Sequence, residues 1–294
     1  MVDAFVIFLR EGIEASMIVA ILLAYLDRAG QRRYFRDVFV GVAAALVLAA
    51  GGGVAAYLTI RTYAGSRVQT IFETVTFVVA AAILTYMTFW MRRHSRTMSS
   101  ELRARAEAAL GRGARAGLSL LAFQAVGREG LETVVFTLAI AFATSAAHVL
   151  IGGAAGLVVA ALIACLIYRL GKQLNLGAFF TTVGALLMVF AAGLLADAVE
   201  NLQQLGWLPF LRQPLWNTGG VLSEDSTLGD IVHSFFGYAS KPTVLQAVVY
   251  VVYLAVVLSA FMGWLPRRRP PQEMAARPHE PSRPRVIAPS AEPR

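Results

Sequence analysis

Cysteine, histidine and charged side chains are scarce in this chain. It has one cysteine, Cys165, and four histidines, and charged residues make up only 15% of the sequence. A single cysteine excludes an intrachain disulfide and a cysteine metal cluster. The sequence also lacks the phosphate-binding loop of ATP-hydrolysing proteins and the Ser/His/Asp, HExxH and paired-aspartate patterns of hydrolases. These absences predict that the protein is not an enzyme.

Apolar residues take the place of the missing charges. They make up 57% of the sequence, with a mean hydropathy of +0.62, whereas soluble domains contain about 25% charged residues. They form runs of about twenty residues, the length of α-helix that crosses a bilayer with its backbone hydrogen bonds satisfied internally. The runs cover residues 2–26, 38–60, 70–91, 118–144, 148–168, 178–200 and 244–265. They predict an all-α integral membrane protein with seven transmembrane helices.

Basic residues divide unevenly between the two sides of these helices. Loops 27–37, 92–117 and 169–177 and the tail from residue 266 contain twenty Lys and Arg residues, whereas the opposite loops contain four. Because basic residues accumulate in cytoplasmic loops, we expect a protein of the inner (cytoplasmic) membrane with its N-terminus outside and its C-terminus in the cytoplasm. The net charge of +8 then reflects topology and contact with membrane lipid, and no nucleic-acid partner is expected.

Two copies of an RExxE motif interrupt otherwise apolar runs, at residues 10–14 and 128–132. An ionised side chain in the middle of a membrane costs about 2.5–3.5 kcal/mol, so residues of this kind are functional by default. On a helix, Glu11 and Glu14 are i,i+3 neighbours and Arg10 and Glu14 are i,i+4 neighbours, which places them on one narrow stripe. Each stripe is therefore able to face a common interior.

The placement of the two motifs indicates an internal repeat. Both fall near the middle of their helices, 118 residues apart, and the first three and next three helices run in opposite directions, as in a 3+3 inverted-topology repeat. We expect repeat halves of about 1–92 and 118–200, an outer loop of 201–243 and a seventh helix, 244–265, outside the repeat. Residues 1–265 then form one transmembrane domain, and 266–294, rich in Pro and Arg, form a disordered cytoplasmic tail.

The charges of the two motifs do not balance. If all six groups are ionised, the site has a net charge of −2, which calls for a cation. The expected metal ligands are Glu11, Glu14, Glu129 and Glu132. Arg10 and Arg128 are the expected charge-balancing partners. Oxygen ligands suit Fe³⁺, Mg²⁺, Ca²⁺ or Mn²⁺. The alternative is that Arg and Glu only neutralise one another and hold the helices together.

Three acidic residues near the outer ends of helices are candidates for gathering ions. Glu73 starts the third predicted helix, and Asp197 and Glu200 form an i,i+3 pair at the end of the sixth. The alternative for each is a solvated residue at a wet helix end.

The motifs resemble those of the oxidase-dependent iron transporters, which include the fungal high-affinity iron permease and the bacterial EfeU-type iron permease. The resemblance rests on REGIE at 10–14, REGLE at 128–132 followed by Thr133, Glu73 with the stretch 83–92, and Phe236-Gly237-Tyr238 before Lys241-Pro242. It covers nearly the whole chain up to about residue 265. It implies a permease without a permanently bound cofactor, in which the four motif glutamates bind transported ferric iron (Fe³⁺).

The resemblance also implies a partner outside the membrane that oxidises or delivers iron: a multicopper oxidase, or a cupredoxin-type protein and a haem peroxidase. Loop 201–243 is the expected docking surface. Two alternatives remain open: a permease for another metal cation such as lead, which shares these motifs, and a proton-coupled carrier of an organic solute. An iron sensor would need a cytoplasmic signalling domain, which the short tail does not supply.

Overall fold

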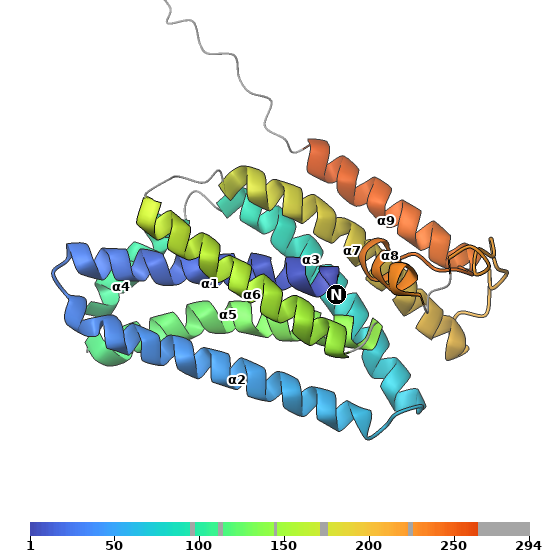
Figure 1. Ribbon diagram of the computed structural model, residues 1–294, viewed down its shortest axis with the longest axis horizontal. Coiled ribbons are helices and arrows are strands. Elements are labelled where there is room, and N and C mark those ends of the chain that lie inside the picture. Colours follow the sequence, from blue (N-terminus) through green and yellow to red (C-terminus); the bar gives the residue numbers. More distant parts are fainter. Residues whose placement is uncertain (95–97, 111–113, 144–145, 171–175, 223–225, 264–294) are drawn as a thin grey trace, which may run out of the picture.

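The computed structural model describes residues 1–94, 98–110, 114–143, 146–170, 176–222 and 226–263 (Figure 1). Its helices are α1 (Val2–Arg28), α2 (Phe35–Arg61), α3 (Arg67–His94), α4 (Met98–Leu110), α5 (Ala114–Ala143), α6 (Ala146–Leu170), α7 (Leu176–Gln204), α8 (Thr227–Phe236) and α9 (Val244–Gly263), with a 3-10 turn, η1 (Arg32–Tyr34), before α2. The predicted tail 266–294 lies outside the described residues.

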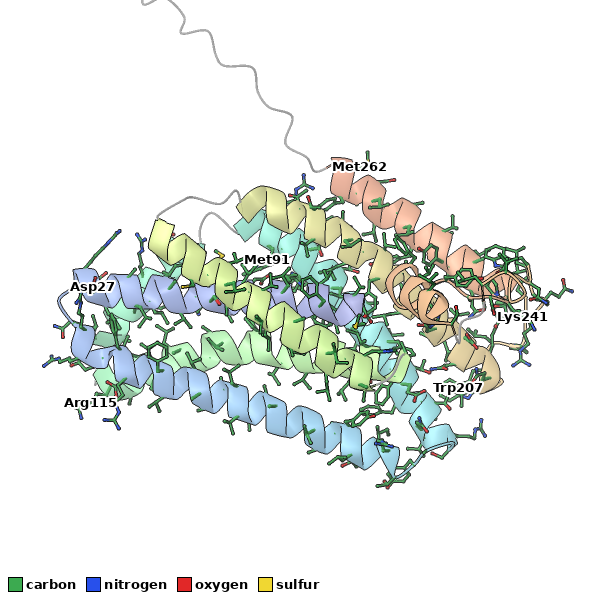
Figure 2. All side chains as sticks on the ribbon, in the orientation of Figure 1. Asp27, Met91, Arg115, Trp207, Lys241 and Met262 are labelled. Carbon is green, nitrogen blue, oxygen red and sulfur yellow. The ribbon has the colours of Figure 1, made fainter. Side chains whose placement is uncertain are left out.

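Most of the long helices have the length and composition of membrane spans. Among the described helices, α2, α3, α6, α7 and α9 are long and apolar enough to cross a bilayer. The helices α1 and α5 are as long, but the RExxE charges interrupt their apolar sequence. Figure 2 shows Asp27 and Arg115 at one end of the bundle and Trp207 and Lys241 at the other. The structure is thus an all-α bundle of the kind predicted.

The helices pack in pairs that join distant parts of the sequence. The most extensive pairings are α1 with α6, α2 with α5, and α3 with α7, and α9 packs on α7. In Figure 1, α2 and α9 lie on opposite sides of the bundle, and α1 and α5 lie between them. The two motif helices are therefore central, and they also contact one another.

Apolar side chains form two cores, one on either side of the RExxE motifs. One core is built around Ile7, Leu84, Phe136 and Ile140, and the other around Leu22, Leu26, Val38 and Leu118. Along α1 and α5, residues 10–14 and 128–132 lie between these two cores. The bundle thus places a charged layer between two apolar layers.

Glycines let the motif helices approach their partners closely. A Cβ atom on Gly12 would lie 2.8 Å from the Cβ atom of Ala160 in α6, and a Cβ atom on Gly130 would lie 2.9 Å from that of Ala49 in α2. Both glycines are the middle residue of an RExxE motif. Small residues at such crossings are typical of packed transmembrane helices, and here they fix the depth of each motif against its neighbour.

Two short helices lie outside the predicted spans. The helix α4 lies within 92–117, the segment predicted as a basic loop, and it buries Leu102 and Ala106 against α1 and α5. The helix α8 interrupts the predicted outer loop 201–243. Its N-terminus is capped by Ser226, whose Oγ accepts a hydrogen bond from the Gly229 N–H at 3.0 Å, and it ends at Gly237 with φ of 64°.

Candidate metal site

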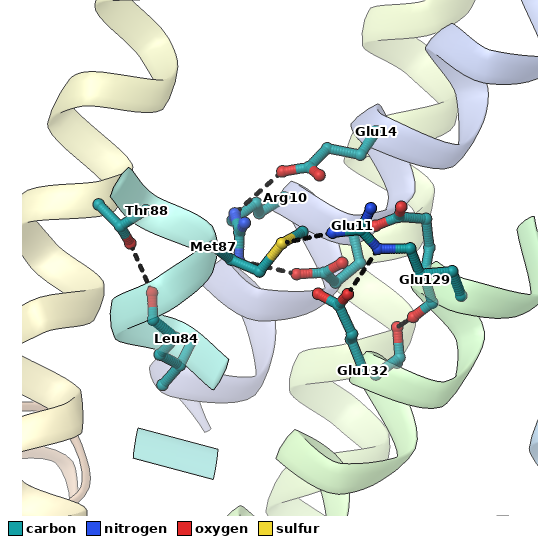
Figure 3. Close-up of polar contacts among 10 residues, drawn as sticks. Arg10, Glu11, Glu14, Leu84, Met87, Thr88, Glu129 and Glu132 are labelled. Atoms are coloured by element: carbon teal, nitrogen blue, oxygen red, sulfur yellow. Dashed lines mark hydrogen bonds and ion pairs between the residues drawn. The ribbon is translucent and has the colours of Figure 1, made fainter. Parts of the chain in front are cut away.

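The first motif forms a buried cluster around one guanidinium. Arg10 lies 3.0 Å from a carboxylate oxygen of Glu11 and 3.0 Å from one of Glu14, and all three side chains are at most 4% exposed (Figure 3). The helix α1 makes this possible because its turn places residues i and i+4 on one face. The predicted stripe of charge therefore exists, and it faces the interior.

The second motif is arranged differently. Glu129 is buried, and Glu132 forms an ion pair with Arg128 at 3.1 Å. The side chain of Glu132 is 12% exposed and that of Arg128 is 42% exposed. The Thr133 hydroxyl that follows the motif donates to the backbone carbonyl of Glu129 at 2.8 Å. The Thr133 side chain therefore forms its hydrogen bond within α5.

The structure brings carboxylates of the two motifs together. One ligand oxygen from each of Glu11, Glu14 and Glu129 lies within 4.8 Å of the others. If the three oxygens stand 4.8 Å apart, the point equidistant from them lies about 2.8 Å from each, slightly more than the 2.3–2.6 Å of calcium–oxygen bonds. Three carboxylates from two helices can therefore share one cation with a small inward movement.

Several oxygens of this cluster lack a hydrogen-bond partner. Within the described part of the chain, no donor reaches Oε2 of Glu11, Oε2 of Glu129 or Oε2 of Glu132. Buried polar atoms are nearly always hydrogen-bonded in native proteins, and exceptions point to a missing ion or to function. Among the described residues, Nη2 of Arg10, a donor, is unpartnered as well. The unpartnered oxygens are acceptors, and a cation or a proton would satisfy them.

An apolar cavity opens beside the cluster. It has a volume of about 540 Å³, lies between α1, α2, α5 and α6, and has Glu11 and Glu129 on its wall. Most of its other lining is aliphatic, such as Leu46, Val54 and Leu157. The carboxylates therefore meet a low-dielectric environment on this side, in which charge interactions are stronger than in water.

Comparison with known proteins agrees with the resemblance found in the sequence. Residues 1–267 match the Iron permease FTR1 family. The chain belongs to this family. It is similar to the ferrous iron permease EfeU of Escherichia coli O6:K15:H31 (strain 536 / UPEC), with 36% identity over 260 residues that cover 88% of this chain and 94% of the relative. No solved structure matches the chain.

Two further relatives extend the comparison. The ferrous iron permease EfeU of Yersinia pestis is 37% identical over 266 residues, covering 90% of this chain and 93% of the relative. A putative inactive ferrous iron permease EfeU of Escherichia coli (strain K12) is 35% identical over 259 residues, covering 87% and 94%. The region matched by the FTR1 family, residues 1–267, includes both RExxE motifs.

The structure adds two residues of α3 that the search for charge did not find. An Nη atom of Arg128 lies 3.0 Å from the sulfur of Met87, and its guanidinium lies over the ring of Trp90 at 4.6 Å from the ring centre. Neither residue is ionisable, so no argument from electrostatics singles them out. Their only signal is that both lie in the stretch 83–92, which resembles the FTR1 family.

The three predicted ion-gathering residues lie away from the cluster. Glu73 accepts a hydrogen bond from Gln69 at 2.6 Å, and it precedes Met87 by 14 residues, or about 21 Å of helix. Both carboxylate oxygens of Glu200 accept hydrogen bonds, from Gln204 at 3.2 Å and from Gln246 at 2.9 Å. Glu200 therefore ties α7 to the start of α9.

Asp197, the third of these residues, lines a small cavity next to His233 of α8. Its role in gathering ions stays a prediction.

Proposed function

We propose that the chain moves iron across the cytoplasmic membrane through the carboxylate cluster of its two RExxE motifs. The observation that carries the proposal is the convergence of Glu11, Glu14 and Glu129, whose ligand oxygens lie within 4.8 Å of one another in a buried layer. Membership of the Iron permease FTR1 family supplies the class of function and the transported element.

The charges of the site explain how it would hold an ion and release it. Arg10 lies 3.0 Å from both Glu11 and Glu14, so it moderates the repulsion between carboxylates when the site is empty. It does not cancel the charge of the four glutamates, and a cation completes the balance. Release requires these carboxylates to loosen, through movement of the helices, protonation or both.

The packing supports an inverted repeat of three plus three helices, with α9 outside it. Exchanging α1 with α5, α2 with α6 and α3 with α7 converts the pair α1·α6 into α5·α2 and leaves α3·α7 unchanged, so the observed pairings are preserved. The close approaches follow the same exchange. The contact of Gly12 with Ala160 corresponds to the contact of Gly130 with Ala49. Gly130 follows Gly12 by 118 residues, and Ala160 follows Ala49 by 111 residues.

The same assignment gives the proposed topology. The helices α1, α2, α3, α5, α6, α7 and α9 are the seven spans, and α4 and α8 lie at the two faces. With the basic loops inside, the N-terminus is outside. The motif helix α1 then runs inward, and the motif helix α5 runs outward. Substrate sites at the midplane between two repeats are typical of secondary transporters.

The oxidation state of the ion is the finer part of the proposal. Carboxylate oxygens are hard ligands, and they favour Fe³⁺ at the cluster over softer cations. Ferrous iron is the second candidate, because the relatives are named ferrous iron permeases. Fe²⁺ arriving at the outer face would require an external oxidising partner before Fe³⁺ could occupy the cluster.

The outer loop is the proposed docking surface for a protein that oxidises or delivers iron. Large apolar side chains there are about half exposed, including Trp207, Phe210 and Trp216. The loop is fixed to the bundle, since the buried side chain of Gln203 donates to the carbonyl of Phe210 at 3.2 Å and accepts from Thr243 at 2.9 Å. A surface held in this way can recognise a partner without first becoming ordered.

Uptake of radioactive iron into proteoliposomes tests the function. Glu14→Ala and Glu132→Ala should each abolish uptake, while insertion and expression stay at wild-type levels. Glu101→Gln, on α4 and outside the site, is the matched control and should transport normally. Unchanged uptake in either motif variant would refute the site.

The same vesicles separate the alternatives. Iron supplied as Fe³⁺–citrate or as Fe²⁺ with ascorbate distinguishes the two oxidation states, and excess Pb²⁺ tests for a lead permease. A carrier of organic solutes would ignore iron and respond to an imposed pH gradient. Absence of iron uptake in the wild-type vesicles, together with solute-driven proton flux, would therefore favour it.

A further inference from the structure

The two RExxE motifs have the same sequence pattern, but their arginines make different contacts. Arg10 reaches both carboxylates of its own motif at 3.0 Å. Within the described part of the chain, the ion pairs of Arg128 include Glu132 but not Glu129. The contact of Arg10 with Glu11 demonstrates that an arginine in this motif is able to pair with the glutamate next to it. Contacts outside the motif must therefore account for the position of Arg128.

Those contacts come from α3. The sulfur of Met87 accepts a hydrogen bond from Arg128 at 3.0 Å (Figure 3). Trp90 offers its ring face to the same guanidinium, 4.6 Å from the ring centre. Thioether sulfur is a weak acceptor, but an indole ring is the best aromatic partner for a guanidinium, more so where water is excluded. Met87 and Trp90, three residues apart on α3, thus both contact the Arg128 guanidinium, and we call this pair of residues the cradle.

The cradle is held firmly in place. Met87 is 1% exposed. The neighbouring Thr88 faces Gly184 of α7, where a Cβ atom would come within 2.7 Å of the Thr88 methyl group. The Thr88 hydroxyl donates to the Leu84 carbonyl at 2.8 Å. The helix α3 is therefore anchored on α7 at the residue that follows Met87.

We propose that Met87 and Trp90 are positioning residues that hold Arg128 away from Glu129 and so keep Glu129 available as the third carboxylate ligand of the transported ion. This inference rests on the proposed function of the cluster. If Arg128 paired with Glu129 as Arg10 pairs with Glu11, a positive charge would compete with the ion for that carboxylate. The cradle therefore sets the affinity of the site without touching the ion.

The test measures KM and kcat for iron uptake in proteoliposomes. Met87→Leu keeps the volume and removes the acceptor, and Trp90→Leu removes the ring face. Each should raise KM by roughly 5-fold or more, the range of a typical coupling between two sites, with a smaller change in kcat. Trp90→Phe keeps a ring face and should stay closer to wild type. Met188→Leu, in the apolar contact of α7 with α9, is the control and should leave KM unchanged.

A double-variant cycle separates positioning from general packing. In the Arg128→Gln background, Met87→Leu should have no further effect on KM, because the charge that the cradle restrains is gone. Equal losses with and without Arg128 would overturn the inference, as would an unchanged KM in both Met87→Leu and Trp90→Leu.

Glu129→Gln, measured in the same series, distinguishes this inference from the function on which it rests. If Glu129→Gln loses uptake while the α3 variants keep the wild-type KM, only the positioning role is overturned. If Glu129→Gln transports normally, the carboxylate site and the inference are both overturned.

Discussion

Neutralising Glu129 with the isosteric change Glu129→Gln should weaken iron binding and stabilise the empty protein at the same time. Ligand oxygens of Glu129, Glu11 and Glu14 lie within 4.8 Å of one another. At an effective dielectric constant of about 20, two unit charges at that distance interact by about 3.5 kcal/mol. The ionised Glu129 therefore faces about 7 kcal/mol of repulsion from two ionised neighbours, before the attraction of Arg10, which offsets part of it.

When the ion is bound, the net electrostatic energy of the Glu129 carboxylate is favourable. The cation attracts the Glu129 carboxylate and loses that attraction in the glutamine variant. Changing a group that only supports a metal ligand typically costs 10- to 100-fold in affinity, so loss of a charged ligand should cost at least about 100-fold. Because an amide keeps the size of the side chain, the loss of iron affinity in Glu129→Gln reports the loss of charge.

Thermal unfolding in detergent, followed with and without added iron, measures both effects. We expect the empty Glu129→Gln protein to unfold a few degrees above wild type and to lose the shift that iron produces in the wild-type protein. Glu101→Gln, an acid-to-amide change on α4, should alter neither value. A lower unfolding temperature for the empty variant together with an intact iron shift would refute the reasoning, because Glu129 would then be a structural partner and not a ligand.

Two further predictions concern packing and the turn between α1 and α2. Gly12→Val should destabilise the protein by about 1–3 kcal/mol in thermal unfolding, because a Cβ atom there would lie 2.8 Å from that of Ala160, whereas Gly51→Ala, with nothing within 4 Å, should not. The hydrogen bond from Arg32 lowers the pKa of Asp27, so this pair stabilises the protein above the ordinary aspartate pKa and loses its effect as pH falls through the lowered value. The difference in unfolding temperature between Asp27→Asn and wild type should therefore disappear in acid, and a difference that grows there would contradict this assignment.

The central helices and the charged layer could be predicted from the sequence because they depend on a simple cost. Apolar runs of membrane length must be helical, and the six motif charges in two of them are too unfavourable to face lipid. The helix α1 ends at Arg28, close to the predicted residue 26. The structure also places together Glu11, Glu14 and Glu129, three of the four glutamates predicted as ligands. That they bind a metal stays a prediction.

Other features depend on contacts between distant residues and could not be read from local pattern. The helix α7 continues to Gln204 although its apolar run ends at Glu200, because the Gln204 and Gln246 side chains both bind the Glu200 carboxylate. The different settings of Arg10 and Arg128 likewise depend on α3. The sequence treats the two motifs as equivalent, whereas in the fold the arginine of the second motif donates a hydrogen bond to Met87.

The pairing of helices has a consequence for movement. Glu11 and Glu14 belong to the unit of α1 with α6, and Glu129 belongs to the unit of α5 with α2. Gly12 and Gly130 bring the helices within each pair into close contact, so the spacing of the three oxygens depends on how one pair is placed against the other. Sliding of one pair past the other would open or close the triangle of oxygens without unpacking either helix pair.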